Sequence, residues 1–437
     1  MSVVENTHSH RTLADARALM AAGRTGEAVS LYLALTESEP SHLEARNALA
    51  VIALSRGDLA EARSHLGVAL AAAPDHALTL NHLARLQQAE GDASSAIQTY
   101  HRLLAQQPQA YAARLAYARL LEDRGDAATA LRHYFRAVRH AQSAGRWLSE
   151  ESTPPALHVA VRRAVALVGQ HRRALCLGIL DRLGERYGRD ALRRAAAFVA
   201  VQLGDASYAP PDTRQKPQRF PFPDLPQTPY YDKRRFDGVA ELEAQTPAIL
   251  AELQVILGAA AGREHVFADP RMAETYLSGD RGPAVWDGYY FYRHGQRNEI
   301  NAAACPQTMA AIDRLPLARV RGHGPEVLFS TLGPGTHLKP HYGVINARVT
   351  AHLPLIVPPG CALRVAGEDH HWRVGEVVAF DDTYLHEAWN YSDQTRVVMI
   401  FDMWHPDLTE AERLAVREVQ EAFSDFGSDA DEPVEAR

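Results

Sequence analysis

The first half of the chain is built on a 34-residue period, along which residues of the same kind recur in register. These positions are Gly23, Gly57, Gly91 and Gly125; Ala28, Ala62, Ala96 and Ala130; Tyr32, Leu66, Tyr100 and Tyr134; and Pro40, Pro74 and Pro108. Each unit of such an array contacts mainly its neighbours. The period therefore predicts an elongated solenoid in this half, not a single globular core.

Each period has the pattern of a helical hairpin. The glycine supplies a left-handed backbone conformation between two helices, the alanine lets the helices approach closely, and the proline ends the unit. In period and pattern the array resembles the tetratricopeptide repeat, and we place it at residues 1–145. The fourth copy has Gln142 where proline is due, which predicts a change of geometry. Such solenoids typically bind a peptide or protein; a rigid spacer or a dimerisation element is the alternative.

The character of the chain changes beyond the array. Residues 146–206 have apolar residues at helical spacing, which predicts further helices that continue or cap the solenoid. Residues 207–235 are rich in proline and predict a linker whose second part docks on the next domain. From about Val285, short apolar runs bounded by turn residues predict an antiparallel sandwich or barrel. We assign residues 236–424 to this domain and residues 425–437 to a disordered acidic tail.

Composition excludes several classes of protein. The formal charge of −7 argues against a general nucleic-acid binder, which normally carries a basic domain. No stretch approaches the roughly 18 apolar residues of a membrane span, and the first residues do not resemble a signal peptide, so we expect a soluble, cytoplasmic protein. The cysteines, Cys176, Cys305 and Cys361, lack C-x-x-C spacing and predict neither a disulfide framework nor a thiolate metal site.

Two predicted strands in the second half carry arginines on defined faces. In "RVTAHLPL", the alternation of a strand places Arg348, Thr350 and His352 on one face. In "TRVVMIFD", the same alternation places Arg396 and Asp402 together. The interior of a barrel is one place where both faces meet.

Two histidines lie close to these strands in the sequence. His341 precedes the first strand, and His386 lies in the turn segment "FDDTYLHEAWN". Neutral imidazole suits Fe(II), and a site with few protein ligands leaves positions open for a chelating cosubstrate and for dioxygen. Arg396 follows His386 by ten residues, far enough along the next strand to clamp a carboxylate of that cosubstrate in a bidentate manner.

Four segments, "PGTHLKPHYGVIN", "HLPLIVP", "FDDTYLHEAWN" and "VMIFDMWHPDLT", resemble the aspartyl/asparaginyl β-hydroxylase family of Fe(II)/2-oxoglutarate oxygenases. With weaker matches they span roughly residues 220–423 in the order and spacing of the family. In eukaryotic members a helical repeat region also precedes the catalytic domain. The resemblance implies an α + β multidomain chain in which a double-stranded β-helix (a jelly-roll, cupin-like fold) follows the tetratricopeptide-like solenoid.

The resemblance also implies roles for individual residues. The iron ligands would be His341 and His386; the 2-oxoglutarate 5-carboxylate would be bound by Arg396 and Ser330, and its 1-carboxylate region by His352; the cosubstrate or substrate pocket would be lined by Arg348 and Trp286. Most oxygenases of this superfamily have a carboxylate two residues after the first histidine, where this chain has Gly343; the family is known to lack that acid. For Asp381 and Asp382 we expect hydrogen bonds to the turn backbone instead of metal coordination.

The implied function is a 2-oxoglutarate-dependent dioxygenase that hydroxylates a carbon, first of all the β-carbon of an Asp- or Asn-type residue in a peptide or protein recruited by the repeats. The family commonly reads Arg-x-Arg-x-His where this chain reads "RVTAH", so Thr350 replaces the second arginine and puts an aspartyl target in doubt. One alternative is a hydroxylase of a small molecule, lipid or carrier-bound amino acid. Another is a repeat-protein adaptor with a decayed oxygenase domain.

Overall fold

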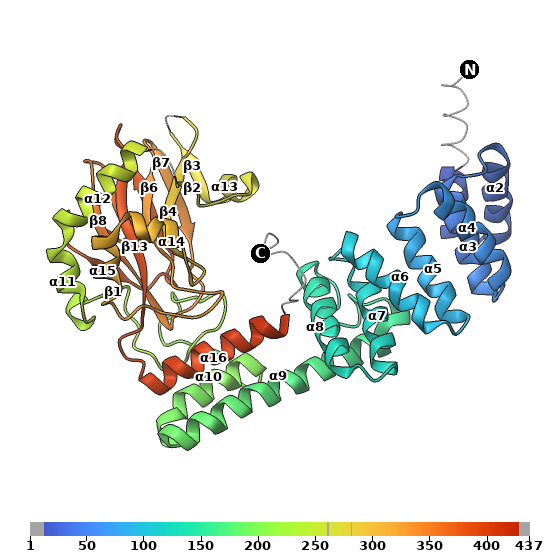
Figure 1. The fold of residues 1–437 in the computed structure, drawn as a ribbon, viewed down its shortest axis with the longest axis horizontal. Coiled ribbons are helices and arrows are strands. Elements are labelled where there is room, and N and C mark those ends of the chain that lie inside the picture. Colours follow the sequence, from blue (N-terminus) through green and yellow to red (C-terminus); the bar gives the residue numbers. More distant parts are fainter. Residues whose placement is uncertain (1–12, 260–261, 281, 428–437) are drawn as a thin grey trace. The chain divides into compact units, whose positions relative to one another are not determined.

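The computed structural model describes residues 13–259, 262–280 and 282–427 (Figure 1). The chain divides between Gln170 and His171 into two compact units, one wholly helical and one that contains both β-sheets. None of the described helices is long and apolar enough to cross a membrane.

The first unit is a series of helical hairpins. After a helical segment over residues 13–21, the helices are α2 (Thr25–Ser38), α3 (Leu43–Arg56), α4 (Leu59–Ala72), α5 (Ala77–Ala89), α6 (Ala93–Gln106), α7 (Tyr111–Asp123) and α8 (Ala127–Ser143), followed by the 3-10 turn η1 (Pro155–Leu157) and the start of α9 (His158–Tyr187). Helices α3 and α4, α5 and α6, and α7 and α8 pack as pairs. The predicted tetratricopeptide-like solenoid is therefore confirmed.

The repeated residues have the positions that the period predicts. The four glycines adopt φ values of 73–87° between helices, and the four alanines are at most 1% exposed at the contacts between helices. The sequence analysis overlooked a further repeated residue. Asp58, Asp92 and Asp126 precede α4, α6 and α8, and each accepts a hydrogen bond from the third backbone N–H of its helix, at 2.9–3.1 Å.

The fourth repeat differs from the others at its end. Helix α8 has 17 residues, whereas α2, α4 and α6 have 14 each. Gln142 lies in the last turn of α8. Because no proline stops the helix there, α8 continues for about another turn.

The second unit contains two antiparallel sheets. The eight-stranded sheet has the order β1-β11-β8-β13-β6-β4-β2, with β5 paired to β4, and the five-stranded sheet has the order β10-β9-β12-β7-β3. The strands are β1 (Tyr230–Tyr231), β2 (Glu264–His265), β3 (Leu277–Gly279), β4 (Trp286–Arg293), β5 (Gln296–Arg297), β6 (Val327–Leu332), β7 (Thr336–His341), β8 (Arg348–Ile356), β9 (Cys361–Val365), β10 (Glu368–His370), β11 (Val378–Phe380), β12 (His386–Asn390) and β13 (Arg396–Trp404).

The connectivity is that of a double-stranded β-helix. From β6 to β13 the chain passes back and forth between the sheets: β6, β8, β11 and β13 belong to the larger sheet, and β7, β9, β10 and β12 to the smaller one. The predicted jelly-roll fold is therefore confirmed.

Short helices cover the outer face of the larger sheet (Figure 1). They are α11 (Val239–Ala244), α12 (Thr246–Ala259), α14 (Glu299–Ala304) and α15 (Pro306–Ile312); α13 (Pro270–Tyr276) precedes β3. Their apolar residues form one core with Val349, Ala351 and Leu353 of β8. The other face of the larger sheet is thereby left for the candidate site.

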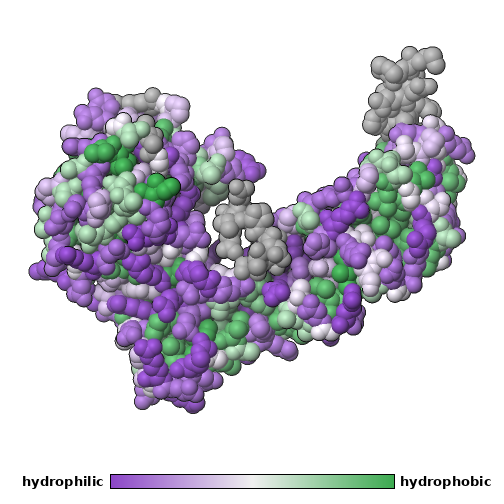
Figure 2. Space-filling view, viewed as in Figure 1, coloured by the Kyte–Doolittle hydropathy of each residue, from purple (hydrophilic) through white to green (hydrophobic). Residues whose placement is uncertain are grey.

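The visible surface mixes hydrophilic and hydrophobic residues (Figure 2), and the isolated exposed side chains Val255 and Ile300 are ordinary for a folded domain.

The helical part of the second unit departs from the predicted boundaries. The second half of α9, η2 (Asp190–Leu192) and α10 (Arg193–Leu203) share a core with α16 (Glu410–Gly427) and with Trp404 of β13. The second unit therefore begins at His171, earlier than the boundary expected at residue 206, because these helices bury their apolar faces within it.

Two further predicted segments also differ in the structure. The predicted linker has no helix or strand over residues 204–229, yet Gln215 is 2% exposed and Phe222 is fully buried, so it docks along much of its length. It ends in β1 and the 3-10 turn η3 (Lys233–Arg235). The tail expected from residue 425 begins as the end of α16, since Phe426 packs on the ring of His171; residues 428–437 lie outside the described residues.

Candidate active site

The two predicted metal ligands face each other across neighbouring strands. His341 ends β7 and His386 begins β12, and the strand register pairs the two residues directly. Their ring centroids are 4.1 Å apart. Residues far apart in the sequence thus come together because β7 and β12 are neighbours in the smaller sheet.

Backbone carbonyls fix the tautomer of both rings. Nδ1 of His341 lies 2.8 Å from the carbonyl oxygen of Lys339, and Nδ1 of His386 lies 3.0 Å from that of Tyr384. A carbonyl only accepts, so each Nδ1 carries the proton and each Nε2 keeps its lone pair. Burial, together with the other histidine, lowers the pKa of His341 to about 4, and burial lowers the pKa of His386. Both rings are therefore neutral at pH 7, as metal ligands must be.

The paired histidines open into a cavity of about 520 Å³ between the two sheets. All seven sequence-predicted site residues line it: Trp286, Ser330, His341, Arg348, His352, His386 and Arg396. The strand faces agree with the alternation, since Arg348, Thr350 and His352 of β8 line the cavity while Val349 and Ala351 enter the core on the other face. The structure brings the predicted residues together; their individual roles remain predictions.

One end of the cavity holds a buried, incompletely paired guanidinium. Arg396 is 3% exposed, and among the described residues neither Nε nor Nη1 has a hydrogen-bond partner. Burial lowers its pKa to about 10. Ser330 lies near this arginine in the fold, because Ser330 of β6 pairs with Val398 of β13. A buried cation of this kind fits an anionic ligand, whose oxygens would satisfy the free N–H groups.

Two side chains next to Arg396 also have polar atoms without partners among the described residues. They are Nδ1 of His352 and Nε1 of Trp372, and the ring of Trp372 lies 4.9 Å from the guanidinium carbon. Burial and the charge of Arg396 lower the pKa of His352 well below its usual value. The sequence analysis did not identify Trp372; the aromatic residue at the end of the segment "GEDHHW" was the available signal.

Another arginine that lines the cavity, Arg348, is paired with a carboxylate. Nη1 of Arg348 lies 3.1 Å from Oδ2 of Asp402, and the hydroxyl of Thr350 donates to Oδ1 of Asp402 at 3.4 Å. Burial raises the pKa of Asp402 to about 6, against the opposing charge of Arg348. Thr350 thus contacts Asp402 at the position where the family commonly has its second arginine.

The expected hydrogen bond to the turn backbone is observed for Asp381, whereas the carboxyl of Asp382 also lies against Gly343, outside its turn. Asp381 accepts from the backbone N–H of Thr383 at 2.9 Å. Asp382 lines the cavity, its Oδ1 has no partner among the described residues, and burial raises its pKa. A Cβ atom on Gly343 would lie 2.1 Å from Cγ of Asp382. The carboxyl of Asp382 therefore occupies the space that a side chain at residue 343 would need.

Replacing Gly343 with alanine is expected to lower the melting temperature, because the new methyl group and the carboxyl of Asp382 cannot share this space. Overpacking of this kind typically costs about 1–3 kcal/mol, which corresponds to roughly 2–4 °C per kcal/mol for a domain of 150–250 residues. Calorimetry of the variant measures the loss. The double variant Gly343→Ala with Asp382→Ala is the control and should recover most of it. A single variant as stable as the parent chain would mean that Asp382 is not held beside Gly343.

Among the residues that the structure describes, no group of three or more His, Cys, Asp and Glu side chains is arranged to hold a metal ion. The local donor set is therefore the two imidazoles, with the carboxyl of Asp382 close enough to His341 for each to affect the pKa of the other.

Comparisons with known proteins agree with this architecture. The family described as "Aspartyl/Asparaginyl beta-hydroxylase" matches residues 243–406, and the family described as "Tetratricopeptide repeat" matches residues 13–77 and 82–145.

Three relatives cover different shares of the chain. The "Ornithine lipid ester-linked acyl 2-hydroxylase" of Rhizobium tropici is 36% identical over 181 residues, 41% of this chain and 61% of that protein. "Aspartate beta-hydroxylase domain-containing protein 2" of Mus musculus is 34% identical over 242 residues, 54% of this chain and 68% of that protein. The human "Aspartyl/asparaginyl beta-hydroxylase" is 36% identical over 129 residues, 29% of this chain and 17% of that protein.

Proposed function

Because this chain belongs to the aspartyl/asparaginyl beta-hydroxylase family, we propose that it is an iron(II)- and 2-oxoglutarate-dependent hydroxylase that uses dioxygen. The single observation that carries the cosubstrate proposal is the state of Arg396. Its side chain lines the same cavity as the paired histidines and is 3% exposed, and its Nε and Nη1 have no hydrogen-bond partner among the described residues. This observation also argues against the decayed adaptor, since an unused buried charge only destabilises the fold.

The residues present fit the proposed cofactor set. Nε2 of His341 and of His386 would hold the iron, with the carboxyl of Asp382 close to His341. When bound, iron and 2-oxoglutarate would supply the oxidising power for the hydroxylation, with one atom of dioxygen in the new hydroxyl group and the other in succinate, released together with carbon dioxide. The iron and cosubstrate thus perform the chemistry, while the protein positions them.

The chain itself orients the cosubstrate and keeps water away. Arg396 would bind the distal carboxylate, with the hydroxyl of Ser330 as a further donor. Oγ of Ser330 already accepts a hydrogen bond from Nε1 of Trp286 at 2.9 Å. His352 would donate near the other carboxylate. Leu338, Leu363, Phe380 and Ile400 line the cavity with apolar surface. Low polarity there strengthens each of these electrostatic contacts.

The contacts of Thr350 favour an uncharged target over an aspartyl side chain. Arg348 is paired with Asp402, and Thr350 adds a neutral hydroxyl at the position of a second arginine. At Thr350, a carboxylate of the target would meet Asp402 without the charge of a second arginine at that position. We therefore propose that the first substrate class is an uncharged residue of a peptide or protein, such as asparagine, and that a carbon of its side chain is hydroxylated. The repeat array would recruit the protein that carries it, in the cytoplasm.

A second candidate is an acyl chain of a lipid or of a carrier-bound molecule. It is favoured by the apolar cavity wall and by the similarity to a protein named as an acyl 2-hydroxylase of ornithine lipid.

Substrate-dependent succinate formation separates the classes. The purified chain with Fe(II), ascorbate and 2-oxoglutarate is given asparagine peptides, matched aspartate peptides, or acyl lipids in micelles. We expect oxidation of an uncharged target, with a mass gain of one oxygen, and little turnover of the aspartate peptides. If aspartate peptides were turned over as fast as asparagine peptides, the proposal that Thr350 disfavours an aspartyl target would be wrong. If only lipids were turned over, the second candidate, an acyl chain, would be the substrate.

A further inference from the structure

The proline-rich segment before the sheets runs along both loops that carry the candidate metal ligands. This segment, residues 208–229, is called the strap. The N–H of Lys216 donates to the carbonyl of Thr383 at 2.8 Å, in the loop that leads to His386. The N–H groups of Gln218 and Arg219 donate to Gly343 at 3.2 Å and to Val344 at 2.8 Å, in the loop that follows His341. A segment without helix or strand thus pairs with both histidine-bearing loops.

A buried asparagine fastens the strap to the loop after His341. Asn346 is 2% exposed. Its Oδ1 accepts from the N–H of Phe222 at 2.8 Å, and its Nδ2 donates to the carbonyl of Phe222 at 2.9 Å. The side chain therefore satisfies both backbone groups of one strap residue, as a neighbouring strand would do. The ring of Phe222 is fully buried and stacks on Phe198 of α10, with 5.4 Å between ring centroids.

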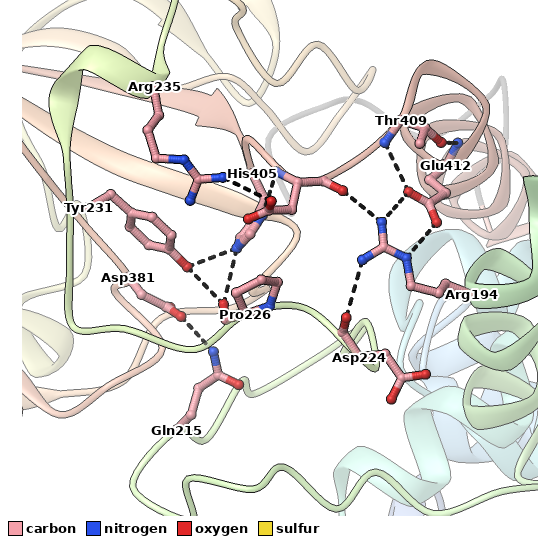
Figure 3. A network of polar contacts seen from close by, with 11 residues as sticks. Arg194, Gln215, Asp224, Pro226, Tyr231, Arg235, Asp381, His405, Thr409 and Glu412 are labelled. Carbon is pink, nitrogen blue, oxygen red and sulfur yellow. Dashed lines mark hydrogen bonds and ion pairs between the residues drawn. The ribbon is translucent and has the colours of Figure 1, made fainter.

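A buried glutamine fastens the strap to the loop before His386. Nε2 of Gln215 donates to Oδ2 of Asp381 at 2.5 Å (Figure 3). Oε1 of Gln215 accepts from the hydroxyl of Tyr208 at 2.5 Å and from Nε2 of Gln227 at 2.6 Å. All of these partners except Asp381 belong to the strap, so the strap is braced internally at the point where it holds this loop.

The far end of the strap is fixed to the rest of the second unit (Figure 3). The carbonyl of Asp224 accepts from Nη1 of Arg194 at 3.2 Å, and Arg194 is paired with Glu412 of α16 at 2.7 Å. The carbonyl of Pro226 accepts from the hydroxyl of Tyr231 at 3.3 Å. The strap is therefore hydrogen-bonded to the second unit at this end as well as at its contacts with the two histidine-bearing loops.

From these contacts we propose that the strap is a positioning element for the two-histidine site, with Asn346 and Gln215 as the positioning residues; this inference rests on the proposed function. The backbone N–H of Gly343 donates to the carbonyl of Asp382 at 2.6 Å, so the two loops are also joined to each other. The strap closes this arrangement from outside and fixes the separation of the histidines. Its Arg219 and Phe220 also line the cavity, so the same element forms part of the substrate wall.

The test compares four variants of the full chain. Asn346→Ala and Gln215→Leu remove the two fastenings. Gln218→Ala is the matched control within the strap. Among the described residues this exposed side chain donates a hydrogen bond to the carbonyl of Lys216, also in the strap, and the variant keeps the backbone bond to Gly343. Leu253→Ala, a change of a buried core residue on α12, is the control for general loss of stability. Manganese(II) with 2-oxoglutarate is the binding probe, read by the electron paramagnetic resonance of the free ion.

Both fastening variants are expected to weaken Mn(II) binding by about 10- to 100-fold, the usual effect of removing a group that orients metal ligands. Both should also speed amide hydrogen exchange of the 338–346 and 381–388 segments in the metal-free chain. Gln218→Ala should match the parent chain, and Leu253→Ala should bind Mn(II) normally despite a lower melting temperature.

The proposal is overturned if the fastening variants bind Mn(II) as the parent chain does, or if Leu253→Ala loses as much affinity. Unchanged exchange in both loops also overturns it. The two proposals fail in different ways: a parent chain that binds no Mn(II) contradicts the proposed function, whereas unchanged exchange in the variants contradicts the strap alone.

Discussion

Replacing His386 or His341 with alanine is expected to abolish binding of a divalent metal and, with it, all turnover. Each ring presents an unprotonated Nε2 because its Nδ1 donates to a carbonyl, and the chain offers these two imidazoles as its local donor set. Loss of one should therefore exceed the roughly 10- to 100-fold effect of removing an outer group. Titration calorimetry with Mn(II) and 2-oxoglutarate measures the binding.

The control for this prediction is His337→Gln on the same strand. His337 contacts Glu387 at 2.7 Å and does not line the cavity. Metal affinity of this variant should stay within about twofold of the parent chain. If His341→Ala and His386→Ala both retained normal affinity while folded, the metal would be bound elsewhere and the assignment of the site would be wrong.

Replacing Arg396 with leucine is expected to weaken 2-oxoglutarate binding while leaving the cosubstrate-free protein as stable as before, or more stable. Removing one partner of a buried, hydrogen-bonded charge pair costs about 2–5 kcal/mol, or roughly 30-fold to several thousandfold in affinity. Without cosubstrate, the same change removes a buried guanidinium with unpartnered N–H groups, whose burial is unfavourable. The two effects have opposite signs, which a general loss of folding cannot reproduce.

Thermal unfolding with and without 2-oxoglutarate measures both effects in one series, since a ligand that binds the folded state raises the melting temperature. Arg373→Leu is the control, because Arg373 is a 79% exposed arginine whose ion pair with Glu376 lies at the surface. An Arg396→Leu variant that is stabilised by 2-oxoglutarate as much as the parent chain would contradict the role of Arg396.

Local pattern was sufficient to predict both the solenoid and the faces of β8 and β13. The repeat period and the alternation along a strand are patterns of residue type at fixed spacing, and such patterns can be read directly from the sequence. The seven predicted site residues meet in one cavity because the jelly-roll order, which the family resemblance implied, makes β7 and β12 neighbours. The boundary between the two units was less predictable, because α10 belongs to the second unit through its packing against α16, which is distant in the sequence.

The surroundings of Asp382 and the docking of the strap depend on contacts between distant segments, which the sequence alone did not indicate. Asp382 was expected to serve its own turn, yet its neighbours Gly343, Arg348 and Thr350 come from other segments. The proline-rich strap looked like a linker because it lacks regular periodicity, although Asn346 supplies the partners that a strand would normally give it. Buried polar residues that pair with distant backbone leave no local signature.

The measurement that tests the central claim most directly needs no substrate. Fe(II) and then 2-oxoglutarate are added without oxygen to the purified chain and to His386→Ala, and the visible charge-transfer absorption of the iron-bound keto acid is followed. The account predicts the band in the parent chain and its absence in the variant. A folded parent chain without this band would contradict the account.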